Sequence, residues 1–362
     1  MQPRFTILIL LFAYFGFPSM PQSSEFDCGI LPDPIINVTY DSRYSDESIT
    51  RANYDAQSNA HVNRVLKPID DFGRKLIALS NIAIRQESKR DKNTNCVVDK
   101  IYQWAKADAL KGQNTIIVKM TIPPRYGIIA MALAQLDIQN DARFTEENAI
   151  IKDWLQRRSY ETIIFFQTKA LGSVPRANLR GWAALAATQV GLLYDNQTLI
   201  RWGILSNQYI LSFINDDGSH PDEMRRGQLA LHYQLHATAP LSTSSALLIK
   251  AGFREELAYL SKLEQMVDFT IAALKNPRLV EAKLNIKQTI TGGLDSIKPS
   301  MIAWVEPYLS IICNAQLNTD INPLRPLSNS KLGGNLTHLY LGDLNSIQQC
   351  LGSAAFPLPS NR

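Results

Sequence analysis

The sequence has little of what would mark several familiar classes of protein. Its four cysteines include no Cys-x-x-Cys pair and lie near no pair of histidines, so neither a zinc site nor a thiol-redox site is predicted. No block of lysine and arginine stands out, and the net charge is only +4, which gives no indication of nucleic-acid binding. Strand-like patterns are scarce, and no unit of roughly 20–50 residues repeats, which excludes the known solenoid types.

The longest apolar run lies at the N-terminus. It extends from Phe5 to Phe17, follows the basic residue Arg4 and precedes a stretch rich in Ser and Gln. A membrane-spanning helix needs about 20 apolar residues, whereas this shorter run has the layout of a cleavable secretory signal. We therefore predict a signal peptide at 1–22 and one domain at 23–362. The mature protein is expected in the periplasm or outside the cell, without a membrane anchor.

Apolar residues recur at helical spacing through most of the remaining chain. Val62, Leu66 and Ile69 begin one such stripe, and the best strand-like run, residues 115–120, is too short to build a sheet. Many helices without repeats predict an all-α protein, either a bundle or a toroid. The predicted helices after the first two (around 62–79 and 98–105) lie at 125–137, 145–169, 179–194, 197–214, 221–237, 242–250, 254–275 and 298–313.

The densest polar stretch follows a predicted turn at Gly218. Arg226 and Tyr233 are seven residues apart, so on one helix they would lie on nearly the same line of its surface. A nearby cation stabilises a phenolate, and a tyrosine so tuned could remove and return a proton. A tyrosine packed in the core with an arginine at its rim would give the same spacing, so both interpretations stay open here.

The same stretch resembles the signature of the mannuronate-specific alginate lyases, polysaccharide lyase family 5. Three further segments are similar to family segments in the same order: 104–110 (WAKADAL), 304–308 (WVEPY) and 332–334 (LGG). The resemblance therefore extends over about residues 28–340. The signature, Gly-x-x-Pro-x-Glu-x-x-Arg-x-x-x-Ala-Leu-x-Tyr, is matched by Gly218, Pro221, Glu223, Arg226, Ala230, Leu231 and Tyr233.

The resemblance implies a single α/α toroid with an open cleft that cleaves acidic polyuronates by β-elimination, without a metal or organic cofactor. Tyr233 would serve as base and acid, and Asn178 and Arg226 would neutralise the C6 carboxylate. The expected partner is an acidic polysaccharide, most closely alginate, and not a nucleic acid or a membrane; the expected state is a monomer.

The resemblance also suggests side chains that bind the sugar. Arg125 and Tyr126 stand where the family has a Lys-Trp pair, and Trp182 matches a family tryptophan. Arg180 and His220 complete the substrate-binding candidates.

The sequence departs from the family at one catalytic position. The family has an Asn-His pair, whereas here Asn178 is followed by Leu179, which cannot donate, accept or titrate. Arg180, His220 and His232 are candidates to replace the histidine. A non-catalytic protein that binds acidic glycans is therefore the alternative function, and a glycoside hydrolase, which would need a pair of carboxylates across the cleft, is a third.

Export with four cysteines predicts two disulfides, and the residues alone leave three pairings open. Family cysteines at positions resembling Cys28 and Cys96 imply that these two pair, which leaves Cys313 with Cys350.

Overall fold

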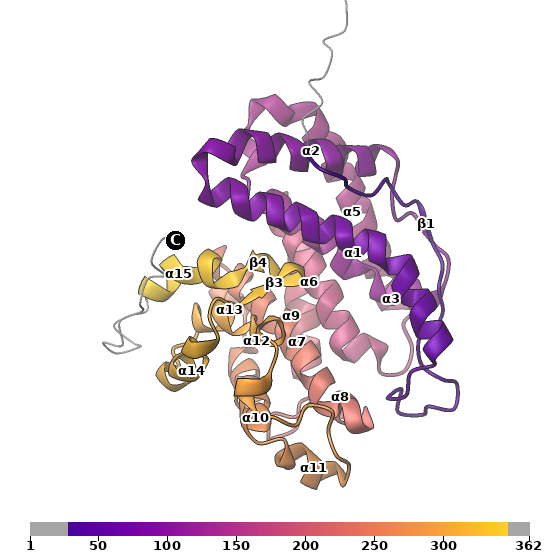
Figure 1. The fold of residues 1–362 in the computed structure, drawn as a ribbon, viewed down its shortest axis with the longest axis vertical. Coiled ribbons are helices and arrows are strands. Elements are labelled where there is room, and N and C mark those ends of the chain that lie inside the picture. Colours follow the sequence, from indigo (N-terminus) through magenta and orange to yellow (C-terminus); the bar gives the residue numbers. More distant parts are fainter. Residues whose placement is uncertain (1–27, 347–362) are drawn as a thin grey trace, which may run out of the picture.

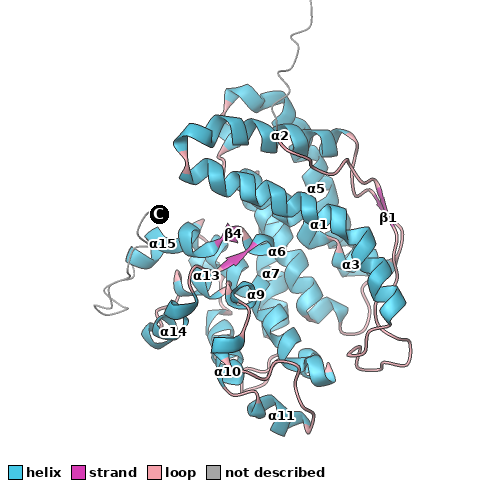
Figure 2. Ribbon diagram, in the orientation of Figure 1, coloured by secondary structure: helices cyan, strands magenta, loops and turns pink. Residues whose placement is uncertain are grey.

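The computed structural model describes residues 28–346 of the 362-residue chain. The predicted signal peptide, 1–22, and Cys350 lie outside these residues, so the signal and the second disulfide stay predictions. Almost all regular structure in residues 28–346 is helical (Figure 2), which confirms the all-α prediction. The longer helices are α1 (Ala56–Arg85), α2 (Arg90–Lys106), α4 (Pro123–Ala134), α5 (Thr145–Thr168), α6 (Asn178–Leu193), α7 (Gln197–Leu211), α9 (Ala230–Lys250), α10 (Leu260–Lys275) and α15 (Leu336–Ser346).

The remaining elements are short. The strands pair as β1 with β2 in parallel and β3 with β4 in antiparallel. The short helices are α3 (Ile116–Thr121), α8 (Pro221–Met224), α11 (Arg278–Leu284), α12 (Pro299–Ile302), α13 (Val305–Leu309) and α14 (Ala315–Ile321), and the strands are β1 (Asn37–Val38), β2 (Gly112–Gln113), β3 (Ser328–Asn329) and β4 (Gly334–Asn335).

Helix α6 lies at the centre of the molecule (Figure 1), where it packs against α4, α7 and α9. Nearly every residue of α6 is buried, including Gly181, Ala184 and Ala187. A helix that is apolar all round belongs in a core, and small side chains let its neighbours approach from several sides. Helix α1 packs on α2 and α4, and α9 packs on α10 and α13. The N-terminus of α6, which begins at Asn178, is therefore placed by helices from both halves of the chain.

Three local predictions from the sequence were wrong. Residues 116–121 form helix α3 and not a strand, because the side chain of Thr115 accepts a hydrogen bond from the Val118 amide (3.2 Å) and caps the helix.

The combined stretch Ile116–Ala134 is apolar and long enough for a membrane span, but 67% of its window is buried inside the protein, as expected of core helices.

The predicted helix 221–237 is broken. Helix α8 ends at Met224, and the chain turns through Gly227, whose φ is +55°, before α9 begins at Ala230. Conversely, α9 runs without interruption through Pro240, where two separate helices were predicted. Arg226 and Tyr233 therefore do not share a helix.

The β3–β4 hairpin is clamped to α1 by the side chain of Asn81. Its Nδ2 donates to the carbonyl of Gly333 (3.1 Å), and its Oδ1 accepts from the amide of Asn335 (2.8 Å). Gly334 has φ +99°, and a Cβ there would lie 2.4 Å from Asn81 Oδ1, so only glycine fits. The hairpin brings Lys331, in the turn between the strands, into the middle of the molecule.

The Cys28–Cys96 disulfide is present, with a Cα–Cα distance of 5.5 Å and a sequence separation of 68. It ties the segment before β1 to helix α2. Closing a loop of this length restricts the unfolded chain. We expect the double substitution Cys28→Ser/Cys96→Ser to lower the free energy of unfolding by about 2–4 kcal/mol, measured by urea denaturation under oxidising conditions. An unchanged urea midpoint in the double variant would contradict this expectation.

Candidate active site

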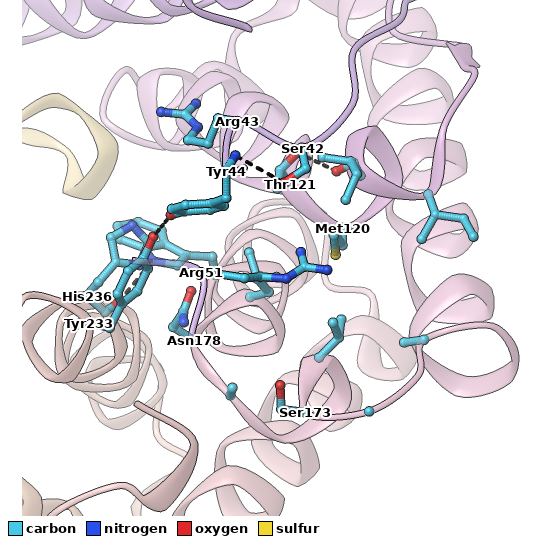
Figure 3. A pocket seen from close by; sticks show the side chains of 18 of the residues that line it. Ser42, Arg43, Tyr44, Arg51, Met120, Thr121, Ser173, Asn178, Tyr233 and His236 are labelled. Carbon is cyan, nitrogen blue, oxygen red and sulfur yellow. Dashed lines mark hydrogen bonds between the residues drawn. The ribbon is translucent and has the colours of Figure 1, made fainter. Parts of the chain in front are cut away.

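A cavity of about 590 Å³ opens at the N-terminus of α6 (Figure 3). One wall is the arm, residues 39–55, which connects β1 to α1. The other walls come from α3 and α4, from the segment that leads into α6, and from α9. Lys331 of the C-terminal hairpin completes the lining. The cavity is therefore assembled from segments spread over nearly the whole chain.

The cavity lining carries more cations than anions. Asp222 is neutralised in part by Arg176, whose Nε lies 2.6 Å from its carboxylate. The basic lining residues are Arg43, Arg51, Arg125, Lys169, Arg226 and Lys331, and the acidic ones are Asp41, Asp222 and Glu223. Such a balance favours an anionic ligand.

Tyr233 and Arg226 meet in the cavity although they belong to different elements. The guanidinium carbon of Arg226 lies 3.5 Å from the centre of the Tyr233 ring and 5.3 Å from that of Tyr44. The hydroxyls of Tyr44 and Tyr233 are hydrogen-bonded to each other (Figure 3). Burial, followed by the influence of Tyr233, raises the pKa of Tyr44 to about 12. Tyr44 therefore keeps its proton and can donate it as a hydrogen bond to the oxygen of Tyr233.

Arg226 also holds the arm in place. Its Nε donates to the carbonyl of Thr50 (3.0 Å) and its Nη2 to that of Arg51 (2.7 Å). Within the arm, Tyr44 and Tyr54 form a β-bridge and their rings stack at 5.0 Å. The arm is thus ordered by contacts to the site itself.

Asn178 is buried at the first residue of α6 and faces Glu223. Its backbone amide donates to Glu223 (2.8 Å), and its Nδ2 lies 3.0 and 2.9 Å from the two carboxylate oxygens. Burial raises the pKa of Glu223 to about 7, against the opposing effect of these hydrogen bonds. Because the amide nitrogen is turned to Glu223, the side-chain oxygen of Asn178 is the atom that remains for the cavity.

Leu179 lines the cavity as an apolar, partly buried side chain. One turn further along the same helix, Trp182 donates its indole N–H to Nδ1 of His236 (2.7 Å) and to the carbonyl oxygen of His236 (3.0 Å). His236, His232 and Tyr233 all come from α9 and line the cavity. The rings of His236 and Tyr233 are 6.0 Å apart between centroids.

Lys331 is a cation without an ion-pair partner within 4 Å among residues 28–346. Burial, and secondarily repulsion from Arg125, lowers the pKa of Lys331 to about 8. Arg125 itself is paired with Asp70, with 3.0 Å between Nε and Oδ1.

Of the residues predicted from the sequence, Tyr233, Arg226, Asn178, Arg125 and Trp182 line the cavity.

Three of the predicted substrate-binding residues lie outside the cavity lining. Tyr126 is fully buried and donates its hydroxyl to Thr162 (2.8 Å). Arg180 turns away to Ser206 (3.0 Å) and to the rings of the neighbouring helix α7. His220 is wholly buried beneath the turn that precedes α8. Adjacent positions on a helix point in different directions, so a residue next to a cavity residue in sequence need not line the cavity.

Sequence reasoning missed Tyr44, His236 and Lys331. For His236 a signal was present, because it follows Tyr233 by three residues and therefore lies on the same face of α9. Lys331 directly precedes the Leu-Gly-Gly motif, whose glycines place it. No periodicity in the arm could have indicated Tyr44.

A helical fold that brings a tyrosine, an arginine and a buried amide to one cationic cavity has the architecture of the helical-toroid polysaccharide lyases. The family model described as alginate lyase matches residues 37–280, and the chain belongs to the alginate lyase family.

Relatives and solved structures agree with this assignment. An alginate lyase of Pseudomonas syringae pv. syringae (strain B728a) is 24% identical over 324 residues, covering 87% of this chain and 83% of the relative. One of Cobetia marina is 23% identical over 321 residues, covering 86% and 83%. The structure of alginate lyase A1-III from Sphingomonas species A1 superposes with a TM-score of 0.70 at 22% identity over 87% of both chains. The predicted α/α toroid is thereby confirmed.

A His→Ala variant of alginate lyase A1-III, solved in complex with a tetrasaccharide, has a TM-score of 0.69 and 22% identity. It covers 89% of this chain and 88% of that one.

Proposed function

We propose that this protein cleaves an acidic polyuronate, most closely alginate, by β-elimination in the periplasm or outside the cell. The observation that carries the proposal is the stacking of Arg226 on Tyr233 at 3.5 Å inside a cavity with excess positive charge. Family membership and the tetrasaccharide bound to the structural neighbour support it. The Cys28–Cys96 disulfide supports an oxidising compartment.

In the proposed reaction, the phenolate of Tyr233 takes the proton from C5 of the uronate. The C–H electron pair moves into the C6 carboxylate, then forms the C4–C5 double bond as the bond from C4 to the glycosidic oxygen breaks. The phenol of Tyr233 returns its proton to the departing oxygen. The hydrogen bond from Tyr44 stabilises the phenolate before the first proton transfer and again after the second. All these groups come from one chain, so a monomer suffices, and no step requires a cofactor.

Charge that develops on the C6 carboxylate must be met by donors already in place. Arg226 uses Nε and Nη2 to hold the arm, which leaves Nη1 for the substrate. Asn178 was predicted to neutralise the carboxylate together with Arg226. Its amide nitrogen is bound to Glu223, so we assign the direct electrostatic role to Arg226 and a positioning role to the Asn178–Glu223 pair.

One observation favours the alternative, a glycan-binding protein without activity. Leu179 presents an apolar side chain to the cavity where the family pattern has histidine. The two functions differ in products, not in binding, because both need the same cationic cavity.

The deciding experiment incubates the purified mature protein with polymannuronate, polyguluronate and polyglucuronate and follows ultraviolet absorbance from the new conjugated double bond. A rise with at least one polymer is expected. Binding of a polymer without a rise would establish the glycan-binding protein, and new reducing ends without absorbance would indicate a hydrolase.

A further inference from the structure

We infer that His236 supplies the imidazole that position 179 lacks: its Nε2–H donates a hydrogen bond to the uronate carboxylate beside Tyr233, and Trp182 fixes it in that form. The inference rests on the proposed function and adds to it a substrate-contacting residue on α9 and a positioning residue on α6. No proton is transferred by His236 in this role; it contributes a hydrogen bond to the charge that grows on the carboxylate.

The tautomer of His236 follows from its neighbour. An indole N–H can only donate, and Trp182 Nε1 lies 2.7 Å from Nδ1 of His236. Nδ1 must therefore be the unprotonated acceptor, and the neutral ring carries its hydrogen on Nε2. Burial, with repulsion from Lys331 as the next cause, holds the pKa of His236 well below its usual range, which agrees with a neutral ring.

Pro240 explains why the indole lies there. A proline within a helix has no N–H for the carbonyl four residues earlier, and in α9 that carbonyl belongs to His236. Trp182 donates to this carbonyl as well, at 3.0 Å. Gly181 leaves room for the contact, since a Cβ there would lie 3.3 Å from Pro240 Cγ. One indole N–H thus satisfies the carbonyl that the proline left open and orients the imidazole.

The position of the free Nε2–H suits a carboxylate. Among residues 28–346 it has no hydrogen-bond partner, and it is not among the buried polar atoms sealed from solvent. His236 lines the cavity together with Tyr233, and Lys331 is the charged group with the largest effect on it. A carboxylate that lies against the cavity-facing edges of both rings, whose centroids are 6.0 Å apart, can accept from Nε2 while its sugar presents C5 to Tyr233.

The competing groups fit less well. Asn178 has its amide nitrogen on Glu223, and Leu179 has no donor. His232 also lines the cavity, but its ring meets Tyr233 edge to face at 5.1 Å and no neighbour among the described residues fixes its tautomer.

The test compares two substitutions that differ in one property. His236→Phe keeps a flat ring and removes the donor, and we expect kcat on the preferred polyuronate to fall about 10²-fold with an unchanged melting temperature. His236→Gln keeps an N–H near the position of Nε2 and should stay within about tenfold of wild type, because a placed donor is the contribution. Equal losses in both variants, or no loss in His236→Phe, would overturn the inference. So would a larger loss in His232→Phe than in His236→Phe.

Rescue provides the second arm. Leu179→His should restore turnover in the His236→Phe background, since it returns one imidazole to the site. Leu179→Met, of similar size and without a donor, should not rescue. Failure of Leu179→His to rescue, with both proteins folded, would count against an exchange of roles between the two positions.

The third arm does not depend on turnover. In the Tyr233→Phe background, ¹⁵N NMR should show His236 with its proton on Nε2, and addition of a short oligouronate should shift that resonance. Trp182→Phe should produce a mixture of tautomers. If the wild type eliminates no polymer, the proposed function fails alone; if the oligouronate binds without shifting Nε2, the inference about His236 fails alone.

Discussion

Tyr233→Phe is expected to reduce kcat by about 10²–10⁴-fold while glycan affinity stays close to that of the wild type. The substitution removes one hydroxyl, which is both the base and the acid of the proposed reaction, and leaves the ring that stacks on Arg226 at 3.5 Å. Turnover is measured by ultraviolet absorbance and affinity by calorimetry with a short oligouronate.

Tyr126→Phe is the matched control. It removes a buried hydroxyl that donates to Thr162, outside the cavity lining, and should leave kcat unchanged. If Tyr233→Phe retained wild-type kcat, the assignment of Tyr233 as base and acid would be wrong.

Arg226→Ala is expected to lower kcat by about 10²–10³-fold, more than it raises KM, because the charge it opposes grows in the transition state. Arg226→Lys keeps the charge but not the planar fork that stacks on Tyr233 and reaches two arm carbonyls, so it should recover only part of the loss.

Arg225→Ala is the control for Arg226→Ala. Arg225 is the neighbouring arginine, and its side chain is 73% exposed and points to Asp222. A rise in KM alone in Arg226→Ala would show that Arg226 only holds the arm and the substrate.

The sequence predicted that Arg226 and Tyr233 meet, but for a reason the structure corrects. Helical spacing placed both on one helix, whereas Gly227 turns the chain and the guanidinium reaches back over the ring from outside α9. Local spacing is informative because it limits where a side chain can reach. Spacing does not reveal an interruption of the helix that depends on a single glycine at positive φ.

Contacts between distant segments were beyond sequence reasoning. Tyr44 lies in an arm without periodicity, and its hydroxyl meets that of Tyr233 across 189 residues of sequence. Arg180 is directed away from the cavity by a contact of the same kind, since the rings that hold it come from helix α7. Helices α1, α2, α4 to α7 and α10 were predicted near their positions because apolar spacing is a local property, whereas α3, α11, α14 and α15 were not.

The clamp between Asn81 and Gly333 spans 252 residues, and this has a consequence for the order in which the chain folds. Contacts so far apart in sequence form late, because their loop must close before they stabilise anything. Helices of the N-terminal half can pack while synthesis continues, but the wall that holds Lys331 waits for the C-terminal hairpin. A chain still emerging from the ribosome therefore has no complete cavity, and the site is complete only when the hairpin that carries Lys331 has been made.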